Sequence, residues 1–88
     1  MSYKVELSPS ARRDLDRLPP RVLSAVAKFL IGPLAENPHR VGHPLRGPFL
    51  GEWSARRGTY RIRYRIKEEA VIVLVVRIAH RADVYRPP

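Results

Sequence analysis

The sequence predicts a small α+β domain in which two helices cover one face of a mostly antiparallel, four-stranded sheet. Three observations favour this fold. Residues 9–34 carry apolar side chains at helical spacing, residues 60–66 alternate between apolar and charged side chains, and residues 71–76 are continuously apolar. Their order along the chain is β-α-α-β-β-β, with the first strand at residues 3–7. A chain of 88 residues is expected to form a single domain over residues 1–88.

The N-terminal half predicts a strand followed by two helices. Residues 3–7 alternate between apolar and polar side chains, as a half-buried strand does. Ser8 and Pro9 then provide a capping hydroxyl and a residue suited to the first helical position. The proline pair at 19–20 ends this first helix near residue 18 and opens a second, whose apolar face runs through residues 22–34. So short a connection predicts an antiparallel helical hairpin.

The C-terminal half predicts a loop and three strands. Residues 36–51 are rich in Pro, Gly and His and show no period, so they are expected to form a long loop. A turn at Gly58 separates the first two of these strands, and residues 67–69 form the next turn. The apolar run at 71–76 is typical of a strand that is covered on both faces.

The strand at residues 60–66 carries the strongest functional pattern in the chain. Its tyrosines and isoleucines fall on one face, and Arg61, Arg63 and Arg65 fall on the other, which is expected to be solvated. Guanidinium groups in a row repel one another unless anions bind them, and their planar donor pattern suits phosphate oxygens. We therefore expect this hairpin to contact nucleic acid. The residues assigned to RNA phosphate are Arg46, Arg56, Arg57, Arg63 and Arg65.

Composition agrees with an anionic partner. Seventeen Lys and Arg against eight Asp and Glu give a net charge of +9, and fourteen of the seventeen bases are Arg. There is no cysteine, so disulfides and thiolate metal sites are excluded. The three histidines show no metal-ligand spacing, and we expect no cofactor or metal. No signal peptide or run of about 20 apolar residues is present, which favours a cytoplasmic protein.

Several short motifs in this order and spacing resemble one known family. They are Ala-Arg-Arg-Asp-Leu at 11–15, Asn-Pro-His-Arg at 37–40, Pro-Leu-Arg at 44–46, the hairpin at 54–64, and His-Arg-Ala-Asp-Val-Tyr at 80–85. Together they resemble the RelE branch of the RelE/ParE superfamily of bacterial toxins, over nearly the whole chain. The resemblance implies a microbial-RNase-like fold. It also implies a toxin silenced by a cognate RelB-like antitoxin, with the 70S ribosome and mRNA as its other partners.

The resemblance further implies metal-independent cleavage of mRNA in the ribosomal A site. The ribose 2′-OH attacks the adjacent phosphate and leaves a 2′,3′-cyclic phosphate and a 5′-hydroxyl. Arg61 matches the arginine that stabilises the transition state, Arg81 the arginine ending the last strand, and Tyr85 the C-terminal tyrosine. Arg56 matches a basic position of the preceding strand. This chain has Ser54-Ala55 where well-known RelE members carry lysines, and its spacing from Arg81 to Tyr85 is two residues shorter.

The residues themselves leave the proton-transfer group open. Arginine is a poor proton shuttle because it stays charged. A tyrosine acts as a base only where cations lower its pKa from about 10, whereas histidine titrates near neutrality. Either His80 or Tyr85 is therefore the expected acid or base, and Arg81 is expected to hold phosphate or assist the leaving group. His39 and His43 are expected to be loop residues only.

Two other functions compete with the nuclease. A ParE-like toxin would share the fold and inhibit DNA gyrase by binding, without a proton-transfer group. A basic RNA- or ribosome-binding module without activity would show the same charge. Arg77 is expected to pair either with Glu52 or with an antitoxin carboxylate.

Overall fold

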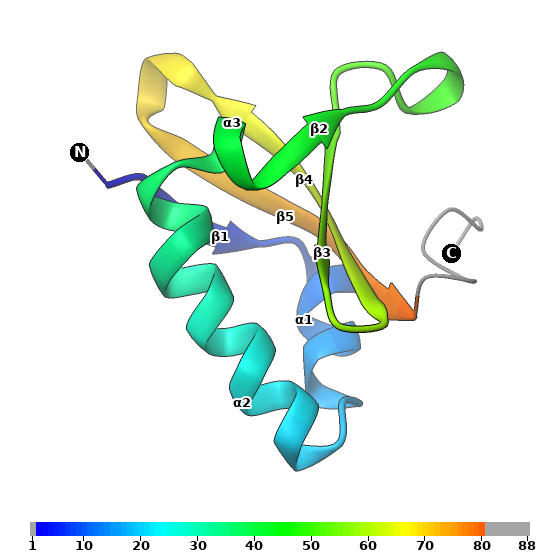
Figure 1. Cartoon of the computed structure of the whole chain (residues 1–88). Helices are drawn as coiled ribbons and strands as arrows, with labels where there is room; N and C mark the ends of the chain where they lie inside the picture. The colour runs from blue at the N-terminus through cyan, green and yellow to red at the C-terminus, as the bar shows by residue number, and fades with distance from the viewer. Residues whose placement is uncertain (1, 81–88) are drawn as a thin grey trace.

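The computed structural model describes residues 2–80 and confirms the α+β class (Figure 1). Five strands form one sheet in the order β1-β5-β4-β3-β2, parallel between β1 and β5 and antiparallel elsewhere. The expected four strands are all present, with one more that the sequence did not predict. The strands are β1 (Lys4–Leu7), β2 (Gly42–Pro44), β3 (Trp53–Arg57), β4 (Tyr60–Lys67) and β5 (Ile72–His80), and the helices are α1 (Pro9–Asp16), α2 (Pro20–Phe29) and α3 (Pro38–Val41).

Helix α1 covers the part of β5 that extends beyond the end of β1. Ser8 is the predicted N-cap, and its hydroxyl accepts a hydrogen bond from the Ala11 N–H at 3.0 Å. The same hydroxyl donates to the Val76 carbonyl of β5 at 2.8 Å. Six residues later, the Asp14 carboxylate accepts a hydrogen bond from the Ile78 N–H at 2.9 Å. Backbone groups of β5 that would otherwise lie unpaired at an open sheet edge are therefore hydrogen-bonded to the side chains of Ser8 and Asp14.

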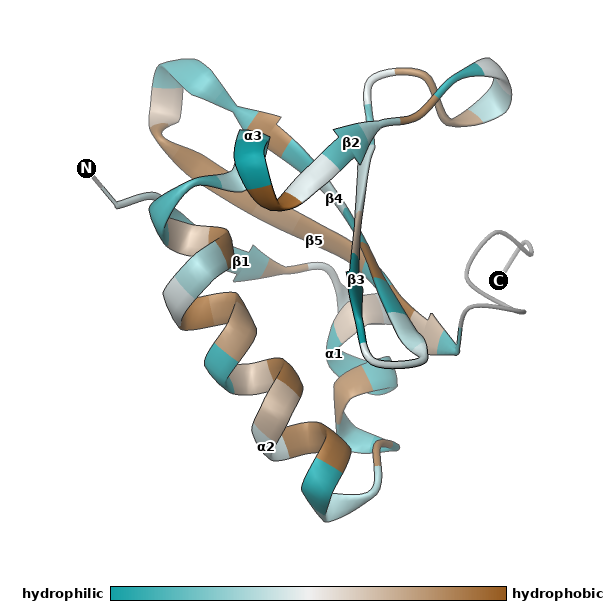
Figure 2. Cartoon of the chain, viewed as in Figure 1, coloured by the Kyte–Doolittle hydropathy of each residue, from teal (hydrophilic) through white to brown (hydrophobic). Residues whose placement is uncertain are grey.

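Helix α2 begins at Pro20, as predicted, and runs to Phe29. A π-helical turn at Leu30–Leu34 continues it, so that Gly32-Pro33 does not end the helical path. Helices α1 and α2 diverge from their short connection, with α1 packed chiefly on β5 and α2 packed on β3 (Figure 1). Brown apolar positions recur along α2 and along most of β5 in Figure 2.

The segment at 36–51 is more ordered than the loop predicted for it. It contains α3, the edge strand β2 and a 3₁₀ turn at Gly47–Phe49. Strand β2 escaped prediction because Gly, His and Pro are poor strand formers. The Tyr64 hydroxyl donates to the Pro38 carbonyl at 2.6 Å, and a Cβ at Gly42 would collide with that hydroxyl. This contact fixes β2 against the core and explains the glycine.

The core lies between the helices and one face of the sheet. Its fully buried strand residues include Ile62, Tyr64, Val73 and Val75. The prediction that the strand at residues 71–76 is covered on both faces is wrong. Ile72, Leu74 and Val76 remain partly exposed. Within residues 2–80, no helix is long and apolar enough to span a bilayer.

Candidate nucleic-acid interface and catalytic site

Two arginines are brought together by the β3–β4 hairpin. Strand register places Arg56 directly opposite Arg61. A two-residue turn joins the strands, and Gly58 takes its first position with a φ of 62°, a left-handed conformation that glycine adopts without strain. Because paired residues share a face, both side chains project away from the helices. Arg56 is exposed and Arg61 is partly exposed, so both can meet a ligand.

Arg63 is buried, so the prediction that it lies on a solvated surface is wrong. It is only 8% exposed. Its Nε lies 2.5 Å from Oε1 of Glu52, and its guanidinium carbon lies 4.6 Å from the centre of the Phe49 ring. Arg65 is exposed, and its Nη2 lies 3.4 Å from the other Glu52 oxygen. One carboxylate from the β2–β3 connection thus serves both arginines, and the positive charge left open on this face is concentrated at Arg56 and Arg61.

A bulge in the β4–β5 pairing moves His80 to the other face of the sheet. The register shifts by one residue between Arg63 and Tyr64, which leaves Val76 without a partner on β4. A shift of one residue reverses which side chains share a face. Beyond it, His80 pairs with Tyr60, and the two rings meet edge to face with centroids 5.9 Å apart. His80 is therefore on the side opposite Arg61, whose partner is Ala79.

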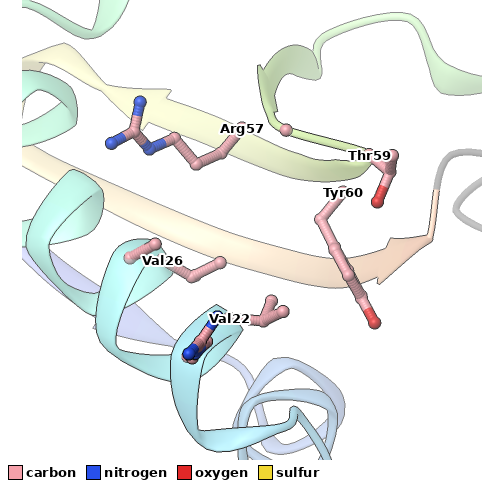
Figure 3. A pocket seen from close by; sticks show the side chains of 8 residues that line it. Val22, Val26, Arg57, Thr59 and Tyr60 are labelled. Carbon is pink, nitrogen blue, oxygen red and sulfur yellow. The ribbon is translucent and has the colours of Figure 1, made fainter.

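Arg57 also lies on the helical side, where it lines a groove. The groove has a volume of about 380 Å³ and lies between α2 and the tip of the β3–β4 hairpin. Figure 3 shows Val22 and Val26 of α2 facing Arg57, Thr59 and Tyr60 across it. Arg46 is exposed at the start of the 3₁₀ turn. Neither Arg46 nor Arg57 is brought to the Arg56–Arg61 pair by the strand register.

Within the described residues, Arg77 pairs with Asp14 of α1 and not with Glu52. Its Nε lies 2.8 Å from Oδ2 of Asp14, and its Nη2 lies 3.3 Å from Oδ1. This arrangement joins α1 to β5 through one carboxylate, which also accepts the Ile78 N–H. Ser10, Arg13 and Arg17 complete a polar cleft around the pair.

The two histidines of the segment at 36–51 have definite positions. His39 lies on α3, its Nε2 is 2.6 Å from Oε1 of Glu68, and its ring packs edge-on against Trp53 at 5.4 Å. His43 lies on β2, where it pairs with Ser54. The expectation that both are loop residues is wrong. Arg81 and Tyr85 lie outside the described residues.

His43 shares a sheet face with the arginine pair, which the sequence did not indicate. Gly42 and Pro44 pair with Ala55 and Trp53 on the core side, so His43 projects to the other side. The position of His43 follows from the presence of β2 and from its register with β3, and neither was predicted from the sequence. Among residues 2–80, no three His, Asp or Glu side chains converge as a metal-binding group.

The chain matches known proteins over nearly its full length. A family model described as "ParE toxin of type II toxin-antitoxin system, parDE" matches residues 5–85. Toxin RelG of Mycobacterium tuberculosis (strain ATCC 25618 / H37Rv) is 54% identical over 86 residues, covering 98% of this chain and 99% of RelG. Toxin RelE of the same organism is 45% identical over 84 residues, covering 96% of this chain and 87% of that toxin.

Solved structures show the same similarity. A chain in the RelBE2 toxin–antitoxin complex of M. tuberculosis is 50% identical with a TM-score of 0.88, covering 91% of this chain and 99% of that one. A mutant E. coli RelE in complex with an antitoxin RelBc peptide is 27% identical with a TM-score of 0.71, covering 97% and 92%. A chain of the intact E. coli RelBE complex has a TM-score of 0.77 at 22% identity, covering 90% and 96%, which supports the fold alone.

Proposed function

This chain belongs to the ParE toxin family of type II toxin–antitoxin systems, and we propose that it is a ribosome-dependent mRNA endonuclease of the RelE kind. The resemblance seen in the sequence implies this activity. The structural observation that supports it is the Arg56–Arg61 pair on the open face of the sheet.

The pair has the electrostatics of a phosphate-binding site. Within residues 2–80, no carboxylate forms an ion pair with Arg56 or Arg61, although Arg63, Arg65 and Arg77 all have one. Two guanidinium groups held on adjacent strands repel each other until an anion lies between them. A phosphodiester whose negative charge grows during reaction fits this position, because fixed cations stabilise the transition state more than the ground state.

The chemistry assigns distinct roles to the predicted residues. Arg61 stabilises the charge that develops on phosphorus, and Arg56 holds a phosphate oxygen beside it. Arg81 is proposed to bind phosphate or assist the leaving oxygen, as the resemblance implies. Of the two proton-transfer groups considered, His80 projects from the opposite face of the sheet, and this favours Tyr85.

The partners proposed for this chain are an antitoxin, the ribosome and mRNA. Similar chains have been crystallised or studied with RelB-type antitoxins. We propose that a RelB-like antitoxin masks the basic face with an acidic segment, which would make the complex sensitive to salt. Cleavage would take place in the cytoplasm, where translating ribosomes are found.

Purified toxin, 70S ribosomes and a short 5′-labelled mRNA test the proposal directly. We expect a single cut in the A-site codon that leaves a 2′,3′-cyclic phosphate, and we expect no cut with Arg61→Ala. Arg12→Ala on the exposed side of α1 is the matched control, since it removes the same charge away from the pair. Absence of RNA cleavage together with inhibition of gyrase supercoiling would instead support the gyrase function. Ribosome binding without either activity would support a non-catalytic module.

A further inference from the structure

The proposed cleavage needs a proton acceptor on the face that carries Arg61. The 2′-OH must lose its proton as it attacks phosphorus, and an imidazole suits this task at neutral pH. His80 projects from the opposite face, and His39 is held by Glu68 against Trp53. Within residues 2–80, His43 is the one imidazole that the strand register places on the side of Arg61.

Strand register also places His43 close to the arginine pair. His43 lies opposite Ser54, which in turn lies opposite Arg63, and Arg56 is two residues farther along β3. His43 and Arg56 are therefore diagonal neighbours, with Cα atoms roughly 7–8 Å apart. Arg61 lies two strands away from His43 and two residues along β4, which corresponds to about 12 Å between their Cα atoms. Across this distance, the side chains of His43 and Arg61 can reach the same phosphodiester and its neighbouring ribose.

Burial decides which groups on this face can touch RNA. Ser54 is fully buried, and Arg63 is held by Glu52 beneath Phe49. His43 and Arg56, by contrast, are exposed, and Arg61 is partly exposed. Arg65 is also exposed on this face, but it pairs with Glu52. The accessible groups here that no described carboxylate pairs are thus one imidazole and two guanidiniums, which is the set that general-base cleavage of RNA requires.

We propose that His43, rather than His80 or Tyr85, is the catalytic base of the cleavage, an inference that rests on the proposed function. The neutral imidazole takes the proton of the 2′-OH, the 2′-oxygen forms a bond to phosphorus, and the bond from phosphorus to the 5′-oxygen breaks. Water gives a proton to the leaving 5′-oxygen, and the resulting hydroxide takes the proton from His43. The imidazole is then neutral again, and the products are a 2′,3′-cyclic phosphate and a 5′-hydroxyl.

The charged neighbour that the strand register gives His43 is Arg56 of β3. Helix α3, which precedes β2, carries the exposed Arg40 and His39, and the His39 ring is held against Trp53 and Glu68 on the core side. Arg63 is the next charge across the sheet, and Glu52 already neutralises it. No described carboxylate pairs with His43, which leaves its ring available to a ribose hydroxyl.

The test compares His43→Gln with His39→Gln in single-turnover cleavage of ribosome-bound mRNA across a range of pH. Glutamine cannot accept the proton, so His43→Gln is expected to lower the rate 10²- to 10⁴-fold with unchanged ribosome affinity. It is also expected to remove the acid-side limb of the pH–rate profile. His39→Gln should retain rate and profile. His43→Glu, which restores a proton acceptor, should recover part of the rate with its acid limb moved to lower pH.

The outcomes separate this role from the proposed function. Full activity of His43→Gln, beside an active wild-type chain, would overturn the role of His43 alone. A lower rate with an unchanged pH profile would also overturn it, since that would indicate a merely structural effect. If the wild-type chain leaves ribosome-bound mRNA intact, the proposed function and the role of His43 both fail. Thermal unfolding of each variant confirms that an exposed substitution has not disturbed the fold.

Discussion

Arg56 and Arg61 lie directly opposite each other on β3 and β4, and within residues 2–80 neither is paired with a carboxylate. If the pair stabilises a transition state, Arg61→Ala should reduce single-turnover cleavage by at least about 100-fold, the usual loss for one fixed electrostatic group. Arg61→Lys should recover only part of the rate, because an ammonium lacks the planar donor fork. Equal activity of Arg61→Ala and wild type would rule out this role.

The buried pair of Arg63 and Glu52 is expected to stabilise the fold rather than bind RNA. Glu52→Gln leaves the buried guanidinium without its counter-charge, so the free energy of unfolding should fall by about 3–5 kcal/mol. Urea denaturation measures this change. Arg65→Ala is the control, because its contact with Glu52 is exposed and should contribute about 1 kcal/mol or less. A Glu52→Gln variant as stable as wild type would contradict the structural role.

Asp14 should be among the residues of α1 that matter most to stability. Its carboxylate holds Arg77 and the Ile78 N–H together. Asp14→Asn keeps the shape but loses the charge, and we expect a destabilisation of about 1.5–3 kcal/mol, as for hydrogen bonds to charged groups. Asp16→Asn, on the exposed side of the same helix, should change stability by less than about 0.5 kcal/mol. Similar effects of the two substitutions would refute the assignment.

Tyr64 should make the stability of the fold depend on alkaline pH. Burial raises the pKa of the Tyr64 hydroxyl above its ordinary value in the folded protein. In the unfolded chain the pKa of the same hydroxyl is about 10. The contribution of Tyr64 to the free energy of unfolding is therefore complete below about pH 10. It is lost as pH rises above this value, because the Tyr64 hydroxyl then ionises in the unfolded chain and this lowers the free energy of the unfolded state. Tyr64→Phe should lower the free energy of unfolding at pH 7 by about 1–3 kcal/mol, since the Pro38 carbonyl loses its donor.

The pH dependence gives Tyr64→Phe a second readout. Urea denaturation at several pH values between 8 and 11 should show a smaller decline in stability for the variant than for wild type. An equal decline in both proteins would show that Tyr64 does not contribute to it.

Much of the fold could be predicted because local patterns agree with the final structure. Ser8-Pro9 starts α1 and Pro20 starts α2, as capping and proline geometry require. The alternation at residues 60–66 predicted β4 and its turn at Gly58, and the same pattern led to Arg61. These features depend on neighbours within a few residues, which a single sequence displays.

The features that could not be predicted depend on contacts between distant segments. The burial of Arg63 depends on Glu52 and Phe49, which precede it in the chain by more than ten residues. The face on which His80 lies depends on a bulge at Val76, and no residue pattern in β5 marks it. The position of His43 could not be predicted because β2 is held in place by its pairing with β3 rather than by its own strand propensity.

The measurement that tests the central claim most directly is the mapping of new mRNA 5′ ends in cells after brief induction of the chain. Wild type and Arg61→Ala would be compared, with Arg12→Ala as the charge-matched control. We expect new ends within translated reading frames for wild type and for Arg12→Ala, and none for Arg61→Ala. Growth arrest without new ends, or the same ends with Arg61→Ala, would contradict the account of Arg61 as the centre of a ribosome-dependent nuclease.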